Sequence, residues 1–129
     1  MRLATPLFIR CPTLIFSPKF RSNPTIIYII MADVLVVYPS GKDFDLKYYT
    51  ETHMPLVTEK WTQHGLKSYT ILQFQEGAPY QVQATLRWGS VEEFDKAAAA
   101  EVAAEIFGDI KNFYSGDPII LKGKIVSTG

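Results

Sequence analysis

The stretch YQVQATLRWGSVEEFDKAAAA, residues 80–100, contains the clearest strand and the clearest helix start of this 129-residue chain. Apolar and polar residues alternate through 80–88, which is the pattern of a β-strand with one buried face. Directly afterwards, Ser90 and Glu93 have the spacing of a capping box, and the alanine run strongly favours a helix. We therefore expect a strand that leads straight into an amphipathic helix.

Elements of the same two kinds are expected on both sides of this stretch. The predicted strands cover residues 34–38, 66–74, 80–88 and 119–126, and the predicted helices cover 43–65 and 90–109. Asp43 or Asp45 is expected to cap the first helix, and Gly65 to end it. The buried stripe of the second helix is predicted to consist of Val91, Phe94, Ala98, Val102 and Ile106.

The order β-α-β-β-α-β predicts a ferredoxin-like α+β fold. Short connections and right-handed crossovers give a four-stranded antiparallel sheet with both helices on one face. Apolar residues occur on both faces of the first and last strands, so the uncovered sheet face needs a partner. We expect a homodimer packed sheet to sheet, which is a dimeric α+β barrel.

The first thirty residues differ in composition from the rest. They contain four of the eight prolines, four of the 13 basic residues and none of the 13 acidic residues. Two interpretations stay open: an upstream extension that is not part of the working protein, or a mitochondrial transit peptide. We assign residues 1–30 to this N-terminal extension and residues 31–129 to the folded domain.

Charge and composition disfavour several classes of function. Residues 31–129 carry nine basic and 13 acidic residues, a net charge of −4, which argues against a nucleic-acid surface. The apolar runs are too short for a membrane helix. Cys11 is the only cysteine, so no disulfide can form within the chain. A cytoplasmic location is the simplest interpretation, unless residues 1–30 direct the protein to mitochondria.

The segment KYYTETHMPLV, residues 47–57, contains the first candidate site residue, His53. Helical spacing places on one face, toward the sheet, the residues Leu46, Tyr49, His53, Leu56 and Val57. A histidine there can act as an acid, a base or a hydrogen-bond donor, or it can be a core residue bonded to a backbone carbonyl. Pro55 predicts either a helix kink between residues 51 and 55 or a restart of the helix, and both place His53 at a break.

Asp109 is the second candidate site residue. It lies at the C-terminal end of the helix predicted for 90–109, where the helix dipole disfavours a carboxylate. It is therefore either a solvated surface acid or the partner of a specific group. His53 is the obvious partner, because a carboxylate can orient an imidazole.

Further side chains are candidates for the walls of a substrate pocket. They are Leu46, Leu56, Val57, Trp61, Tyr69, Trp88 and Ile106, with Phe74, Phe107 and Tyr114 as additional aromatic candidates. No two His or Cys residues have metal-ligand spacing, and no phosphate-binding or nucleotide-binding motif is present. We expect neither a metal nor a cofactor.

Three segments together resemble the EthD family, which is named for ethyl tert-butyl ether degradation: VYPSGKDFD at 37–45, YYTETHMPLV at 48–57 and EIFGDIKNF at 105–113. The resemblance covers about residues 33–126. It implies a small dimeric α+β barrel. His53 then corresponds to the histidine of the HMP motif, Asp109 to the acid of GDI-x-N, and Tyr49 to the second tyrosine.

The resemblance also implies an activity: an oxidoreductase of monooxygenase type, or a decarboxylase that tailors aromatic intermediates. Our first hypothesis is a cofactor-free enzyme for a small apolar or aromatic molecule. His53 would be its general base or acid, Asp109 the orienting partner and Tyr49 a hydrogen-bond donor. The alternative is a non-catalytic protein that binds or presents a hydrophobic molecule. A third hypothesis treats His53 and Asp109 as a packed polar pair without a cavity beside them.

Overall fold

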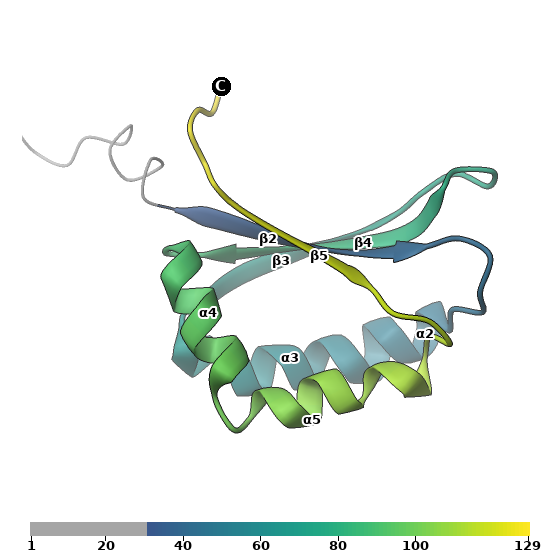
Figure 1. The fold of residues 1–129 in the computed structure, drawn as a ribbon, viewed down its shortest axis with the longest axis horizontal. Helices are drawn as coiled ribbons and strands as arrows, with labels where there is room; N and C mark the ends of the chain where they lie inside the picture. Colours follow the sequence, from purple (N-terminus) through teal and green to yellow (C-terminus); the bar gives the residue numbers. More distant parts are fainter. Residues whose placement is uncertain (1–30) are drawn as a thin grey trace, which may run out of the picture. The chain divides into compact units, whose positions relative to one another are not determined.

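Four antiparallel strands form one sheet in the computed structural model, which describes residues 31–129. The strands are β2 (Ala32–Pro39), β3 (Leu66–Gln73), β4 (Tyr80–Trp88) and β5 (Ile119–Lys124), arranged in the order β3-β4-β2-β5. Figure 1 shows the helices together on one face of this sheet. The predicted ferredoxin-like α+β fold is therefore confirmed. The expectations for residues 1–30, including Cys11, lie outside the described residues.

The first helical region is one continuous stretch built from four pieces. These are α2 (Leu46–Tyr48), a π-helical turn (Tyr49–His53), α3 (Met54–Trp61) and a 3₁₀ turn (Thr62–His64). The carboxylate of Asp45 caps its start by accepting from the N–H of Tyr48 at 3.0 Å. Gly65 ends it with φ of 118°, a left-handed conformation that favours glycine. Both predicted ends are confirmed.

The prediction of one unbroken helix over 90–109 is wrong in its middle. The structure has α4 (Val91–Ala99), α5 (Ala103–Gly108) and a 3₁₀ turn (Ile110–Asn112). Ala100 ends α4 with ψ of 157°, so the chain turns inside the alanine run. High helix propensity does not prevent this, because packing against the sheet overrides it.

The break also changes which side chains of this region are buried. The fully buried positions are Phe94, Ala97, Ala103 and Ile106, whereas the predicted Val91, Ala98 and Val102 are only half-buried. At the start of α4, the hydroxyl of Ser90 accepts from the N–H of Glu93 at 3.1 Å, as the capping box predicts. The carboxylate of Glu93 accepts from the N–H of Gly89 instead of Ser90.

The two faces of the sheet differ in what covers them. The alternation predicted for 80–88 is confirmed, because the helix-facing side chains of β4 are buried: Val82, Ala84, Leu86 and Trp88. No helix within residues 31–129 covers the opposite face (Figure 1). On that face Leu35 pairs with Leu121, which is 52% exposed, and Val37 pairs with Ile119. We call this surface the outer face. Because it carries apolar side chains that no helix within residues 31–129 covers, we still propose that two copies of the chain pair through it as a homodimer.

Candidate functional site

A π-helical turn positions His53. The N–H of Met54 bonds to the carbonyl of Tyr49, five residues earlier, which widens the helix by one residue at this point. Pro55, which has no N–H to donate, then lies in the first turn of α3. Of the two alternatives for Pro55, the restart of the α-helix is the one observed. The wide turn leaves both Tyr49 and His53 buried.

The extra residue also sets which side of α3 faces the sheet. The inward positions are Met54, Val57 and Trp61, all buried. Leu56, predicted from regular helical spacing, is only half-buried. Met54 was not predicted, because a constant 3.6-residue period does not include a π turn.

His53 and Asp109 form a direct contact. Asp109 ends α5, and one of its carboxylate oxygens, Oδ2, lies 2.8 Å from Nδ1 of His53. The side chains are 5% and 13% exposed, so the pair is largely shielded from solvent. The predicted partnership is present, and the alternative of a solvated surface acid is wrong.

Two further side chains bind the same carboxylate. The hydroxyl of Tyr48 donates to Oδ1 of Asp109 at 2.7 Å, and the amide of Asn112 donates to the same oxygen at 2.8 Å. Neither residue was predicted from the sequence as part of the site. For Asn112, the one signal in the sequence is its spacing three residues after Asp109. Tyr48 was not predicted, because regular helical spacing places its neighbour Tyr49 on the face toward the sheet.

The protonation states of the pair follow from its surroundings. Burial lowers the pKa of His53 and outweighs the hydrogen bond and charge of Asp109, which would raise it. For Asp109, burial alone would raise the pKa, but the hydrogen bonds from Tyr48, His53 and Asn112 together lower it. The pKa of the Tyr48 hydroxyl is raised, first by its hydrogen bond to Asp109. Near neutral pH the pair therefore consists of a neutral imidazole and a carboxylate.

These states assign the proton on the imidazole. An ionised carboxylate can only accept hydrogen bonds, so Nδ1 of His53 must donate to Asp109. The neutral ring then has an unprotonated Nε2 with a free lone pair. Within residues 31–129 no hydrogen bond to Nε2 is found, which leaves this nitrogen available as a base.

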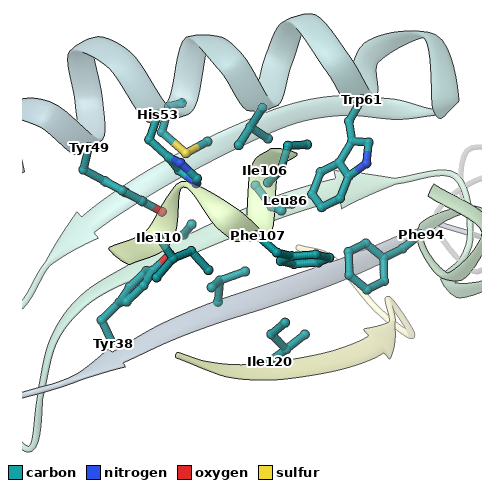
Figure 2. A pocket seen from close by; sticks show the side chains of 14 residues that line it. Tyr38, Tyr49, His53, Trp61, Leu86, Phe94, Ile106, Phe107, Ile110 and Ile120 are labelled. Atoms are coloured by element: carbon teal, nitrogen blue, oxygen red, sulfur yellow. The ribbon is translucent and has the colours of Figure 1, made fainter. Parts of the chain in front are cut away.

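A pocket lies beside His53, between the helices and the sheet (Figure 2). One end carries His53, Tyr49 and Tyr38, and the other end is formed by the rings of Trp61, Phe94 and Phe107. The remaining lining residues are aliphatic: Val36, Met54, Val57, Ala84, Leu86, Ile106, Ile110 and Ile120. The presence of a pocket disfavours the hypothesis of a packed polar pair without a cavity.

The pocket is narrow in this structure. The space open to the centre of a water molecule is about 30 Å³, room for about two waters. Phe107 and Ile120 line it and yet are 38% and 39% exposed, so they form its boundary with solvent. A ligand larger than a few atoms therefore requires these side chains to move.

The structure brings only some of the predicted pocket residues together. Val57, Trp61, Ile106 and Phe107 line the pocket, whereas Leu46, Leu56, Tyr69, Trp88, Phe74 and Tyr114 do not. Trp88 is fully buried behind Trp61 and Phe94, with ring centroids 5.6 and 5.4 Å away. Tyr69 is exposed on the edge strand β3.

The other corrections have equally local reasons. Leu46, at the start of α2, packs against the core as a half-buried residue. The hydroxyl of Tyr114 donates to the carbonyl of Pro39 at 2.9 Å, away from the pocket. Tyr49 does line the pocket and stacks on His53, with centroids 5.4 Å apart and planes 16° from parallel. Its role as a hydrogen-bond donor stays a prediction.

Within the part of the chain that the structure describes, no cluster of three or more His, Cys, Asp or Glu side chains is arranged to hold a metal ion. Nor does this part contain a helix long and apolar enough to span a membrane.

Comparison with known proteins places the chain in a family. The sequence matches no protein-family model and no curated protein. Among solved structures, an EthD-like protein of Ralstonia eutropha JMP134 has 30% sequence identity and a TM-score of 0.65; the match covers 75% of this chain and 93% of that one. The chain belongs to the EthD family. The recognition made from 37–45, 48–57 and 105–113 is thereby confirmed.

More distant structures share the EthD fold. SnoaB, a cofactor-independent oxygenase of Streptomyces nogalater, has 12% identity and a TM-score of 0.57, over 76% of this chain and 94% of its own. The hydroxynitrile lyase of Passiflora edulis has 10% identity and a TM-score of 0.59, over 78% and 98%. The fold of this EthD protein is therefore one that small-molecule enzymes use.

Proposed function

We propose that this EthD protein is a cofactor-free enzyme in which His53 removes a proton from a small, neutral, largely apolar molecule. The observation that carries the proposal is the orientation of one imidazole. Its Nδ1 is held by Asp109 at 2.8 Å, and the ring lines an apolar pocket. A base that is oriented, neutral and shielded from water is what proton abstraction near pH 7 needs.

The proposed step is a single proton transfer. A hydroxyl or an activated C–H group of the substrate gives its proton to Nε2 of His53, and the electron pair stays on the substrate. The resulting imidazolium is stabilised by the carboxylate of Asp109, which is already ionised. Because burial lowers the pKa of His53, the imidazole is unprotonated and ready to accept at neutral pH.

The lining of the pocket limits the class of substrate. It includes no Lys or Arg side chain, so nothing in the lining would pair with a carboxylate or phosphate. Three aromatic rings at the end opposite His53 suit an apolar or aromatic body. These features favour a neutral phenol or a similarly acidic apolar molecule.

The same features bear on the reaction. A decarboxylase would need to hold a carboxylate in the pocket, whereas a monooxygenase acts directly on a neutral molecule. We therefore favour oxygenation: the deprotonated substrate reacts with O₂, takes up one oxygen atom, and loses two hydrogens with the other oxygen as water. The relation to a cofactor-independent oxygenase of the same fold supports this order of preference.

The second candidate function is non-catalytic binding of a hydrophobic molecule. The observation that favours it is the lining of the pocket, which apart from His53, Tyr38 and Tyr49 consists of apolar side chains and Trp61. Such a lining suits the binding of a hydrophobic body without any reaction.

Oxygen uptake with a panel of neutral mono- and bicyclic phenols separates these functions. Wild type and His64→Gln, a change at an exposed histidine outside the pocket, should consume O₂, and His53→Gln should lose at least 100-fold of that rate. Binding is followed in parallel through the fluorescence of the two tryptophans, of which Trp61 lines the pocket and Trp88 packs against it. Phenols that bind to wild type without any O₂ uptake would establish the binding function instead.

A further inference from the structure

We propose that Tyr48 and Asn112 are positioning residues, which hold the carboxylate of Asp109 so that one oxygen faces His53 and so set how basic His53 is. The meaning for catalysis rests on the proposed function. The positioning itself is a property of the free protein. Neither residue lines the pocket, so neither touches the substrate.

The three donors divide the two carboxylate oxygens between them. Within residues 31–129, Oδ2 accepts only from His53 at 2.8 Å, whereas Oδ1 accepts from Tyr48 at 2.7 Å and from Asn112 at 2.8 Å. Rotation of the carboxylate about its Cβ–Cγ bond would break all three bonds at once. The pair on Oδ1 therefore fixes the direction in which Oδ2 points.

Each positioning residue is itself held in place. The ring of Tyr48 stacks on Phe113, with centroids 6.3 Å apart and planes 23° from parallel, and its backbone N–H donates to Asp45. Asn112 belongs to the 3₁₀ turn that follows Asp109 directly, so the two side chains share one short segment. Nδ2 of Asn112 also lies 3.5 Å from the Tyr48 hydroxyl, at the limit of a hydrogen bond.

The position of Asp109 explains why such support is needed. The carboxylate stands at the C-terminal end of α5, where the helix dipole disfavours negative charge. The backbone N–H of Asp109 is already donated to Glu105 and Ile106. Side-chain donors therefore supply the stabilisation that the helix end does not.

The same bonds set how strongly Asp109 acts on the imidazole. While Tyr48 and Asn112 hold Oδ1, Oδ2 stays within hydrogen-bond distance of Nδ1 and stabilises a proton on His53. The titratable groups that face His53 are Asp109 from the end of α5, Tyr49 of its own turn and Tyr38 of β2 at the same end of the pocket. Tyr48 acts on His53 only through Asp109. Loss of either donor frees the carboxylate to turn away from Nδ1, so it should lower the pKa of His53.

The test is an NMR titration of the two histidines in full-length protein, with the exposed His64 as the internal reference. Tyr48→Phe and Asn112→Ala should each move the midpoint of His53 downward by roughly half a pH unit. Tyr114→Phe is the matched control: it removes a tyrosine hydroxyl bonded to the Pro39 carbonyl and not to Asp109. It should leave His53 unchanged.

An unchanged or raised His53 midpoint in Tyr48→Phe overturns the inference, whatever happens to stability. If that variant does not fold, an unchanged or raised midpoint in Asn112→Ala, a change at an exposed side chain, overturns it as well. If one of the phenols is a substrate, the acid limb of its pH–rate profile should shift in each variant together with the titration midpoint of His53. Absence of turnover in wild type refutes the proposed function, but a lowered midpoint in the variants still supports the positioning roles.

Discussion

Replacement of Asp109 by asparagine is the most informative single perturbation of this site. The two donors on Oδ1, Tyr48 at 2.7 Å and Asn112 at 2.8 Å, require an acceptor there. The amide oxygen of the new asparagine is its only acceptor, so it should take that place, and the NH₂ group should face His53. Nδ1 of His53 would then have to accept, which moves the proton of the neutral ring to Nε2.

The magnitude follows from this change of tautomer and from the lost charge. A base whose lone pair points away from its substrate slows turnover by about 10³–10⁴-fold. In Asp109→Asn, residue 109 no longer carries a negative charge, so the bond to His53 is no longer charge-assisted. This weakens the stabilisation of the His53 imidazolium by about 1–1.5 kcal/mol. That corresponds to about one pH unit, so the pKa of His53 should fall further below its usual value.

The assay is ¹⁵N NMR of the histidine side chains, because the shift of each ring nitrogen reports whether it carries the proton. Wild type should show a protonated Nδ1 at His53, and Asp109→Asn a protonated Nε2 with a lower titration midpoint. Asp95→Asn, at an exposed acid of α4 that pairs with Lys122 of β5, should change neither. A His53 that keeps its proton on Nδ1 in Asp109→Asn would refute the reasoning about the donors.

Four further changes test other parts of the structure. Ser90→Ala removes the cap of α4 and should lower the free energy of unfolding in urea by about 1 kcal/mol; a loss below about 0.3 kcal/mol would contradict the capping role. Phe107→Ala should open the pocket and raise the affinity for bulkier apolar ligands, measured by fluorescence, whereas Tyr80→Ala, equally exposed at 38% but outside the pocket, should not. We propose that the outer faces pair in a homodimer, so Leu121→Lys should give a monomer by light scattering, and a wild-type monomer would exclude the pairing. Because the pKa of His53 is lowered on folding, the free energy of unfolding should decline as the pH falls from about 6.5 to about 5. His53→Leu should abolish the decline in that range, measured by urea unfolding at each pH followed by circular dichroism.

The fold could be predicted from the sequence where local pattern and tertiary packing agree. The alternation through 80–88 identified the buried side of β4, and Asp45 and Gly65 marked the ends of the first helical region. The alanine run is the opposite case. Its propensity predicts an unbroken helix, but the chain turns at Ala100 so that α5 can return along the sheet and place Ile106 over the pocket.

The candidate site could be predicted only for residues whose position is unusual in itself. An imidazole on the inward face of a helix and an acid at a helix C-terminus each require an explanation, and together they predicted the contact between His53 and Asp109. Tyr48 and Asn112 are ordinary surface residues by pattern. The contact of Tyr48 with Asp109 depends on where the chain returns in space after 61 residues, which no local spacing encodes. For Asn112 the spacing of three residues after Asp109 is a local signal, but it does not by itself show a contact.

Three locally unfavourable features meet within this site. A π turn at Tyr49–His53 is a rare backbone form, a histidine among apolar side chains must lose its hydration, and Asp109 opposes the dipole of α5. An apolar residue at 53 and a neutral residue at 109 would avoid two of these penalties. Stability alone therefore does not account for the combination. The three features together orient one unprotonated nitrogen toward a pocket, which argues that function has set these residues where local energetics would have chosen others.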